Sequence, residues 1–173
     1  GDSFTAAYHA AQKYGLNDMR FYAFDSFNGL PPITGIDREI PQFSTGKYTC
    51  TEEEFKRNIA KNGVNLERAV SVPGWYSDTL NEKTKRKLLI QSASVIWIDC
   101  DLYESAVSAL NFITDYVVDG TIVIFDDWFC FRGSPQRGEQ RAFREWISKY
   151  NSISFSEYMV SGFCGLTVIL HRE

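Results

Sequence analysis

The chain has 173 residues, of which 44% are hydrophobic and 15% aromatic, so it can bury a core of its own. Its net charge of -4, without a basic stripe among the aromatic residues, argues against a nucleic-acid partner. No apolar run is long enough to span a membrane and no signal peptide is evident, so we expect one soluble domain over residues 1–173 with no membrane partner.

Four cysteines are scattered without CxxC spacing: Cys50, Cys100, Cys130 and Cys164. This spacing argues against a zinc site and favours reduced thiols. We therefore expect a cytoplasmic protein.

Helical patterns and short apolar runs alternate from the start of the chain. Apolar residues between Phe4 and Ala11 recur at helical spacing, and Gly15 follows as a stop signal. A continuous apolar run over 20–24 then predicts a strand that is covered on both faces, as strands in parallel sheets are.

The next irregular stretch, residues 28–48, contains three prolines and three glycines. Loops of this length inside a domain are usually functional lids or mobile segments. Thr51 with Glu54 then forms a capping-box pattern, which predicts a helix that ends near Gly63.

Three further apolar runs, at 69–72, 94–98 and 121–125, predict strands that are likewise covered on both faces. Apolar stripes at helical spacing predict two more helices, one from Ala106 to Val117 and one from Phe143 to Tyr150.

The last two runs, 153–160 and 163–171, are separated only by Ser161 and Gly162, which predicts an antiparallel hairpin. The alternation before them implies right-handed βαβ units. The predicted fold class is therefore α/β, a doubly wound and mostly parallel sheet that closes with a C-terminal antiparallel hairpin.

Aspartates follow three of the four runs assigned to the parallel part of the sheet: Asp25, Asp99, and the pair Asp126 and Asp127. Ligands of open α/β sheets bind beyond the carboxyl ends of the strands. If the strands at 94–98 and 121–125 are neighbours, the last three aspartates lie within a few ångströms of one another.

Such crowding must be offset, because two carboxylates about 4 Å apart repel by roughly 4 kcal/mol at an effective dielectric of about 20. A shared proton, a basic side chain or a divalent cation would each do so, and Arg132 is the one basic candidate close in sequence. We favour Mg²⁺ before Ca²⁺, because few carboxylates plus waters suit magnesium. The alternative is that these aspartates cap helices and bind loop amides, and Asp101 in particular fits a helix cap.

Asp25 can be interpreted separately, as a cofactor-binding residue. An acid that ends the strand after the first helix is where doubly wound folds bind the ribose hydroxyls of an adenosine-containing cofactor. Gly1 resembles the last glycine of a glycine-rich turn, and the following helix would offer free amides to an anionic group.

Five ordered blocks resemble the macrocin O-methyltransferase family of class I S-adenosylmethionine-dependent enzymes, which methylate sugar hydroxyls in macrolide and related antibiotics. The blocks are FDSFNGLPP (24–32), GWYSDTL (74–80), IDCDLYES (98–105), DGTIVIFDDW (119–128) and GEQRAFREW (138–146). The resemblance spans nearly the whole chain and implies a Rossmann-like methyltransferase fold.

The resemblance implies that Asp99, Asp126 and Asp127 bind Mg²⁺ and that Asp99 is also the general base. It implies a site for S-adenosylmethionine at Gly1, Asp25 and Ser26, with Trp75 or Tyr76 bordering the adenine. The expected acceptor is a small molecule with neighbouring hydroxyls, such as a sugar, which magnesium would orient and acidify. A homo-oligomer is compatible with the sequence.

The family's first strand, which precedes the glycine-rich turn, is absent before Gly1. We therefore expect a chain truncated at its N-terminus relative to the family. Two other readings remain open: a metal-dependent glycosyltransferase that uses DCD as its metal motif, and a non-catalytic relative that binds a small molecule.

Overall fold

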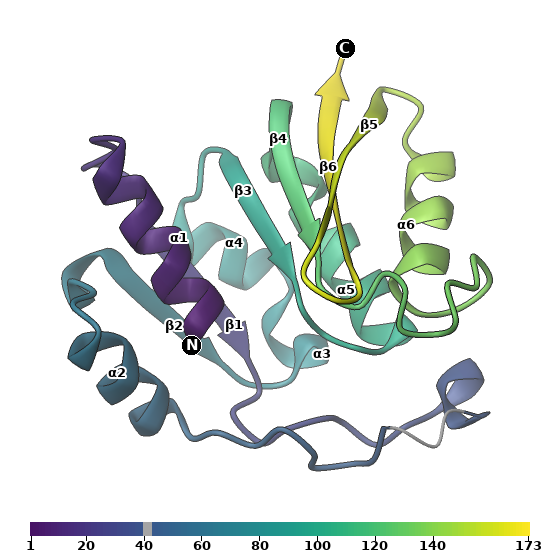
Figure 1. Cartoon of the computed structure of the whole chain (residues 1–173), viewed down its shortest axis with the longest axis horizontal. Coiled ribbons are helices and arrows are strands. Elements are labelled where there is room, and N and C mark those ends of the chain that lie inside the picture. Colours follow the sequence, from purple (N-terminus) through teal and green to yellow (C-terminus); the bar gives the residue numbers. More distant parts are fainter. Residues whose placement is uncertain (40–42) are drawn as a thin grey trace. The chain divides into compact units, whose positions relative to one another are not determined.

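A computed structural model describes residues 1–39 and 43–173, and the chain divides into two units that we describe separately (Figure 1). Unit 1 contains the described residues of Gly1–Ile33 and Gln42–Thr79, and unit 2 those of Thr34–Pro41 and Leu80–Glu173. None of the described helices is long and apolar enough to cross a membrane. Residues 40–42 of the predicted irregular stretch lie outside the described part of the chain.

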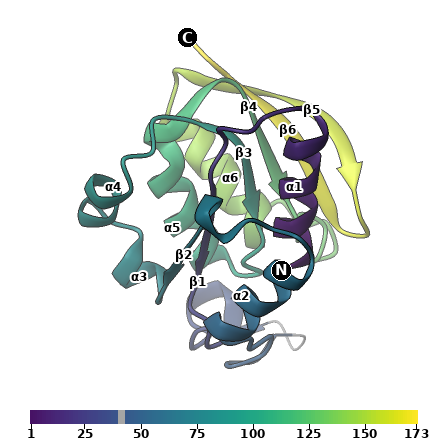
Figure 2. The same ribbon diagram turned by 90° about the vertical axis from the view of Figure 1, so that its left-hand side faces the viewer.

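Unit 1 is built around two parallel strands, and its elements can be followed in Figure 2. In chain order it contains α1 (Asp2–Lys13), β1 (Phe21–Asp25), α2 (Glu52–Lys61), the short 3₁₀ turn η2 (Leu66–Arg68), β2 (Ala69–Pro73) and α3 (Tyr76–Thr79). Strands β1 and β2 pair in register so that their last residues, Asp25 and Pro73, lie opposite each other.

Apolar residues of α1, β1 and α2 form the core of unit 1. Its buried members are Tyr8, Ala11, Phe21, Ile59 and Val64. Helix α2 begins where the capping box predicts. The Thr51 hydroxyl accepts from the Glu54 N–H at 3.2 Å, and the Glu54 carboxylate accepts from the Thr51 N–H at 2.9 Å.

Unit 2 contains a mixed four-stranded sheet in the order β3-β4-β6-β5. Its elements are η1 (Gly35–Glu39), α4 (Glu82–Leu88), β3 (Ala93–Ile98), α5 (Tyr103–Ile113), η3 (Thr114–Tyr116), β4 (Val117–Phe125), α6 (Gly138–Lys149), β5 (Ile153–Ser161) and β6 (Gly165–Arg172). Strands β3 and β4 are parallel, whereas β6 is antiparallel to both of its neighbours, so the predicted C-terminal hairpin is confirmed.

Helix α6 packs on this sheet through aromatic side chains, and Figure 1 shows it beside the hairpin strand β5. The ring of fully buried Phe143 lies 5.0 Å from that of Phe125 in β4 and 5.0 Å from that of Phe155 in β5. The Trp146 indole N–H donates to Thr114 Oγ1 at 2.9 Å, which connects α6 to the end of α5. These contacts hold the middle of α6 against β4, β5 and the residue that follows α5.

Two expectations about the strands are corrected. Strand β4 begins at Val117, which the helical stripe had included, because the chain straightens after η3. Strand β3 is not covered on both faces in the described chain: Val95 and Trp97 are 47% and 39% exposed. It is an edge strand of its sheet and pairs only with β4, so its continuous apolar run does not mark burial on both sides.

The hairpin offers a test of close packing beside the end of β4. A Cβ atom at Gly165 would lie 2.6 Å from the Phe125 carbonyl oxygen, whereas one at Gly162 would meet nothing within 4 Å. We expect Gly165→Ala to lower the free energy of unfolding by about 2–3 kcal/mol through overpacking. Gly162→Ala should lower it by about 1 kcal/mol, because of its positive φ alone. Urea denaturation measures both, and equal losses would contradict the steric argument.

Candidate functional site

Acidic residues meet where β3 and β4 end. The parallel register pairs Ile98 with Phe125, so Asp99 and Asp126 follow directly from paired positions. The main-chain N–H of Asp126 donates to the Ile98 carbonyl at 3.0 Å, which continues the ladder by one residue. The predicted neighbourhood of the two strands is therefore confirmed, and the side chains of Asp99 and Asp126 are exposed.

Asp127 differs from these two residues because it is half-buried and held by neighbours. Its carboxylate is 3.0 Å from the Cys130 thiol and is hydrogen-bonded by the Asp101 main-chain N–H. Burial raises the pKa of Asp127, and the negative charge of Asp126 raises it further. The end of β4 thus carries one solvated acid and one acid that resists ionisation.

A buried acid that sequence reasoning did not single out lies beside this pair. Glu139, in the first turn of α6, is fully buried, and its Oε2 accepts from the Asp127 main-chain N–H at 3.1 Å. Its Oε1 has no hydrogen-bond partner. Burial raises the pKa of Glu139 well above its usual range, and the charges of Asp127 and Asp99 add to the effect. An acid in the first turn of an amphipathic helix normally suggests only a dipole interaction, so the pattern gave no signal for burial.

The interpretation of Asp101 as the cap of α5 is wrong. The N-cap position is Leu102, and the Tyr103 and Glu104 main-chain N–H groups donate instead to the two oxygens of Asp37, at 3.2 and 3.5 Å. Asp101 itself has a positive φ of 57°, at the bend between β3 and α5. The cap comes from η1, in the stretch expected to be an irregular lid.

The acids of residues 1–39 and 43–173 form no preassembled metal site. Within these residues, no three His, Cys, Asp or Glu side chains are grouped closely enough to hold a metal ion. Arg132, the one basic residue considered as a partner, is exposed and forms no ion pair with the two neighbouring aspartates within the same residues.

Three of the residues expected at the cofactor lie at the ends of β1 and β2 in unit 1. Asp25 is exposed, and its Oδ1 accepts from the Phe27 N–H at 2.7 Å. Ser26 is half-buried and donates to the Gly29 carbonyl at 2.9 Å. Half-buried Trp75 follows Gly74, whose N–H donates to the Asp25 carbonyl at 2.9 Å, so the structure brings Asp25 and Trp75 together.

Gly1, the fourth of these residues, is the N-cap of α1. It makes no side-chain cap, and its carbonyl accepts from the N–H and hydroxyl of Thr5. A Cβ atom here would lie 3.3 Å from Ile59 Cγ2, so the chain passes close to α2 at this point.

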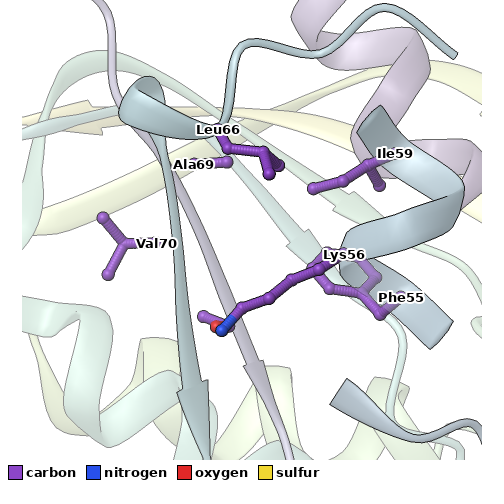
Figure 3. A pocket seen from close by; sticks show the side chains of 7 residues that line it. Phe55, Lys56, Ile59, Leu66, Ala69 and Val70 are labelled. Carbon is purple, nitrogen blue, oxygen red and sulfur yellow. The ribbon is translucent and has the colours of Figure 1, made fainter. Parts of the chain in front are cut away.

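A groove of about 410 Å³ lies elsewhere in unit 1, between α2 and β2 (Figure 3). It is lined mainly by apolar side chains, and none of the predicted site residues borders it. The lining residues are Phe55, Lys56, Ile59, Leu66, Ala69, Val70 and Ser71. Glu52 accepts from Lys56 at 2.6 Å and from the Ser71 hydroxyl, so the polar groups near it are already paired.

Comparisons with known proteins agree on one family. The family model described as Macrocin-O-methyltransferase (TylF) matches residues 4–149. The chain is 30% identical over 120 residues to the 8-demethyl-8-(2,3-dimethoxy-alpha-L-rhamnosyl)-tetracenomycin-C 4'-O-methyltransferase of Streptomyces olivaceus. This match covers 66% of the chain and 44% of that relative, so the chain spans less than half of its length.

Solved structures share the fold. The O-methyltransferase NovP superposes with a TM-score of 0.72 at 23% identity, over 94% of this chain and 63% of that one. TomG from Streptomyces achromogenes, an O-methyltransferase solved in complex with SAM, gives 0.59 at 14% identity, over 99% and 80%. The chain therefore has an α/β methyltransferase-like fold with mixed sheets.

The buried cap Asp37 predicts a pH dependence of stability. Burial raises the pKa of Asp37 above its usual value, more than the two main-chain hydrogen bonds lower it. An acid with a raised pKa in the folded state loses stability as pH rises from about 4 through that pKa. Asp37→Asn does not ionise, so its free energy of unfolding relative to the wild type should increase from pH 4 to pH 7. Urea titrations at several pH values measure this, and a pH-independent difference would contradict it.

Proposed function

Since the chain belongs to the macrocin O-methyltransferase family, we propose that the protein transfers the methyl group of S-adenosylmethionine to a hydroxyl oxygen of a small molecule. The observation that carries this proposal is the match over residues 4–149, which includes both the acids after β3 and β4 and the ends of β1 and β2. In the reaction the new bond joins the methyl carbon to the acceptor oxygen. The bond from that carbon to sulfur breaks, and S-adenosylhomocysteine leaves.

The cofactor binds in unit 1, at Gly1, Asp25, Ser26 and Trp75. The Asp25 carboxylate would accept hydrogen bonds from the ribose hydroxyls, which its exposure and its position at the end of β1 support. Trp75 would border the adenine, and its place next to Gly74, which is hydrogen-bonded to Asp25, supports a shared role. At Gly1 the start of α1 offers main-chain amides to an anionic group.

The acids of unit 2, Asp99, Asp126 and Asp127, would hold Mg²⁺. Three observations support this site: Asp99 and Asp126 directly follow the last paired residues of β3 and β4, their carboxylates are exposed, and half-buried Asp127 lies next to Asp126 in the chain. A bound divalent cation would supply charge neutralisation here and would lower the pKa of a chelated hydroxyl. The described structure has no preformed group of three ligands, so the site would assemble on binding.

Asp99 would act as the general base. Its carboxylate is exposed directly after β3, where an acceptor hydroxyl could reach it, and it would take the proton as the oxygen–methyl bond forms. A hydroxyl is poorly nucleophilic while it keeps its proton, so proton removal and orientation are what this chain contributes to the reaction.

The acceptor would be a sugar or another molecule with two neighbouring hydroxyls. The Streptomyces olivaceus relative is named for 4'-O-methylation of a 2,3-dimethoxyrhamnosyl group, which supports a sugar as the acceptor. A chelating pair is also the arrangement that an acidic edge with a hard cation would orient best.

Substitution at Asp25 tests the cofactor site. Asp25→Asn keeps an oxygen that can accept from Phe27, whereas Asp25→Ala removes both that turn and the ribose acceptor. In the full-length protein we expect both variants to bind S-adenosylhomocysteine about 10-fold more weakly or worse, because a charged hydrogen bond is lost. Isothermal titration calorimetry measures the affinity, with Asp18→Asn as an exposed control. Wild-type affinity in both Asp25 variants would contradict the assignment.

Substitution at the acidic edge tests the metal and the base. Asp126→Asn should weaken Mg²⁺ binding by about 10-fold or more, and Asp99→Asn should abolish methyl transfer, because it removes both a ligand and the proton acceptor. Glu157→Gln, an exposed acid on β5, should change neither. Calorimetry with Mg²⁺ and a methyl-transfer assay with sugar diols are the measurements. Full activity in the presence of EDTA would refute the magnesium assignment, and activity in Asp99→Asn would refute the base.

A further inference from the structure

Glu139 has an arrangement that packing alone does not require. It is the first-turn acid of α6, it is fully buried, and no ion pair neutralises it among the described residues. Its Oε1 has no hydrogen-bond partner, although buried polar atoms are usually paired. An apolar side chain of similar size would fill the same space without an unsatisfied oxygen.

The carboxyl group of Glu139 meets the chain segments that follow both β3 and β4. The N–H of Asp127 donates to Oε2 at 3.1 Å, and the main-chain N–H of Cys100 also hydrogen-bonds to this carboxyl group. Cys100 is the residue after Asp99. One buried side chain therefore holds the main chain beside Asp99 and the main chain of Asp127.

Two further hydrogen bonds join the segments after β3 and β4 to each other and to α6. The Asp101 N–H hydrogen-bonds to the Asp127 carboxylate, and Gln140, next to Glu139 on α6, donates to the Trp128 carbonyl at 2.8 Å. The turn after β4 is thus attached to α6 through the Asp127 N–H and the Trp128 carbonyl. The segment after β3 is attached to Glu139 as well, through the main-chain N–H of Cys100.

We infer that Glu139 is a positioning residue, which sets the spacing between Asp99 and the pair Asp126 and Asp127 by binding the main chain beside both. The inference rests on the proposed function, because it assigns a purpose to that spacing. Glu139 contacts neither the acceptor nor the cofactor in this proposal. Its effect on a metal ion is transmitted through the two main-chain segments.

The test compares three variants of the full-length protein. Glu139→Leu removes the acceptor at similar volume, and Glu139→Gln keeps one carbonyl oxygen for the two N–H groups. Phe143→Leu, on the same helix, weakens the aromatic core without touching the acids. Binding of Mn²⁺, followed by electron paramagnetic resonance, and of Mg²⁺, followed by calorimetry, gives the metal affinity. Amide hydrogen exchange at Cys100 and Asp127, followed by nuclear magnetic resonance, gives the state of the two segments.

We expect Glu139→Leu to bind either metal about 10-fold more weakly or worse, with faster exchange at both amides. Glu139→Gln should keep the affinity within about threefold of the wild type. Phe143→Leu should lower the melting temperature and leave the affinity unchanged. The inference would be overturned if Glu139→Gln behaved like Glu139→Leu, or if Phe143→Leu weakened metal binding as much as Glu139→Leu.

The two proposals fail in different ways. If the wild type binds neither Mn²⁺ nor Mg²⁺, the proposed metal site is wrong, and amide exchange still decides the role of Glu139. Unchanged exchange at Cys100 and Asp127 in Glu139→Leu would overturn the positioning role, whatever the metal affinity.

Discussion

The parallel pairing of β3 with β4 is the constraint on which the acidic site depends. The ladder runs through Ile98 and Phe125, and the Asp126 N–H extends it by donating to the Ile98 carbonyl. Parallel strands end at the same edge, so acids placed directly after the two strands lie at that edge together. This backbone arrangement is the reason that the carboxylates would repel one another and that a cation could bind between them. The proposed chemistry depends on it for the same reason.

The acids at this edge have unequal environments. Asp99 and Asp126 are exposed, whereas burial raises the pKa of both Asp127 and Glu139. The solvated acids are suited to meeting a ligand, and the buried acid holds main-chain N–H groups. A site of this kind separates residues that can act on a substrate from those that fix the backbone around it.

Much of the fold could be predicted because it depends on local patterns. The apolar runs located β1 and β2 within a residue, and the Thr51–Glu54 box located the start of α2, since both signals lie within a few neighbouring residues. The start of β4 was missed because Val117 lies four positions after Ile113 and so continues the apolar stripe of α5 at helical spacing. Coverage of β3 was overestimated because an apolar run does not tell which neighbours a strand has.

Of the site, the sequence predicted the acids that follow strands but not the side chains that support them. Glu139 lies 12 positions from Asp127, and Asp37 lies 66 positions from Tyr103. No periodicity links positions so far apart, and burial of a single acid depends on the packed tertiary structure. The expectation for Asp101 failed for the same reason, because a capping residue can come from a distant segment.

The cap that Asp37 provides has an evolutionary consequence. A helix whose first N–H groups are satisfied from its own preceding residues can be moved or rebuilt as a local unit, but α5 has no side-chain cap at Leu102. The main-chain N–H of Tyr103, at the start of α5, instead donates to Asp37 of η1, which lies far upstream in the chain. Leu102 is itself buried in the core, so a polar cap placed there would cost packing, and a loss of Asp37 could not be compensated cheaply at that position.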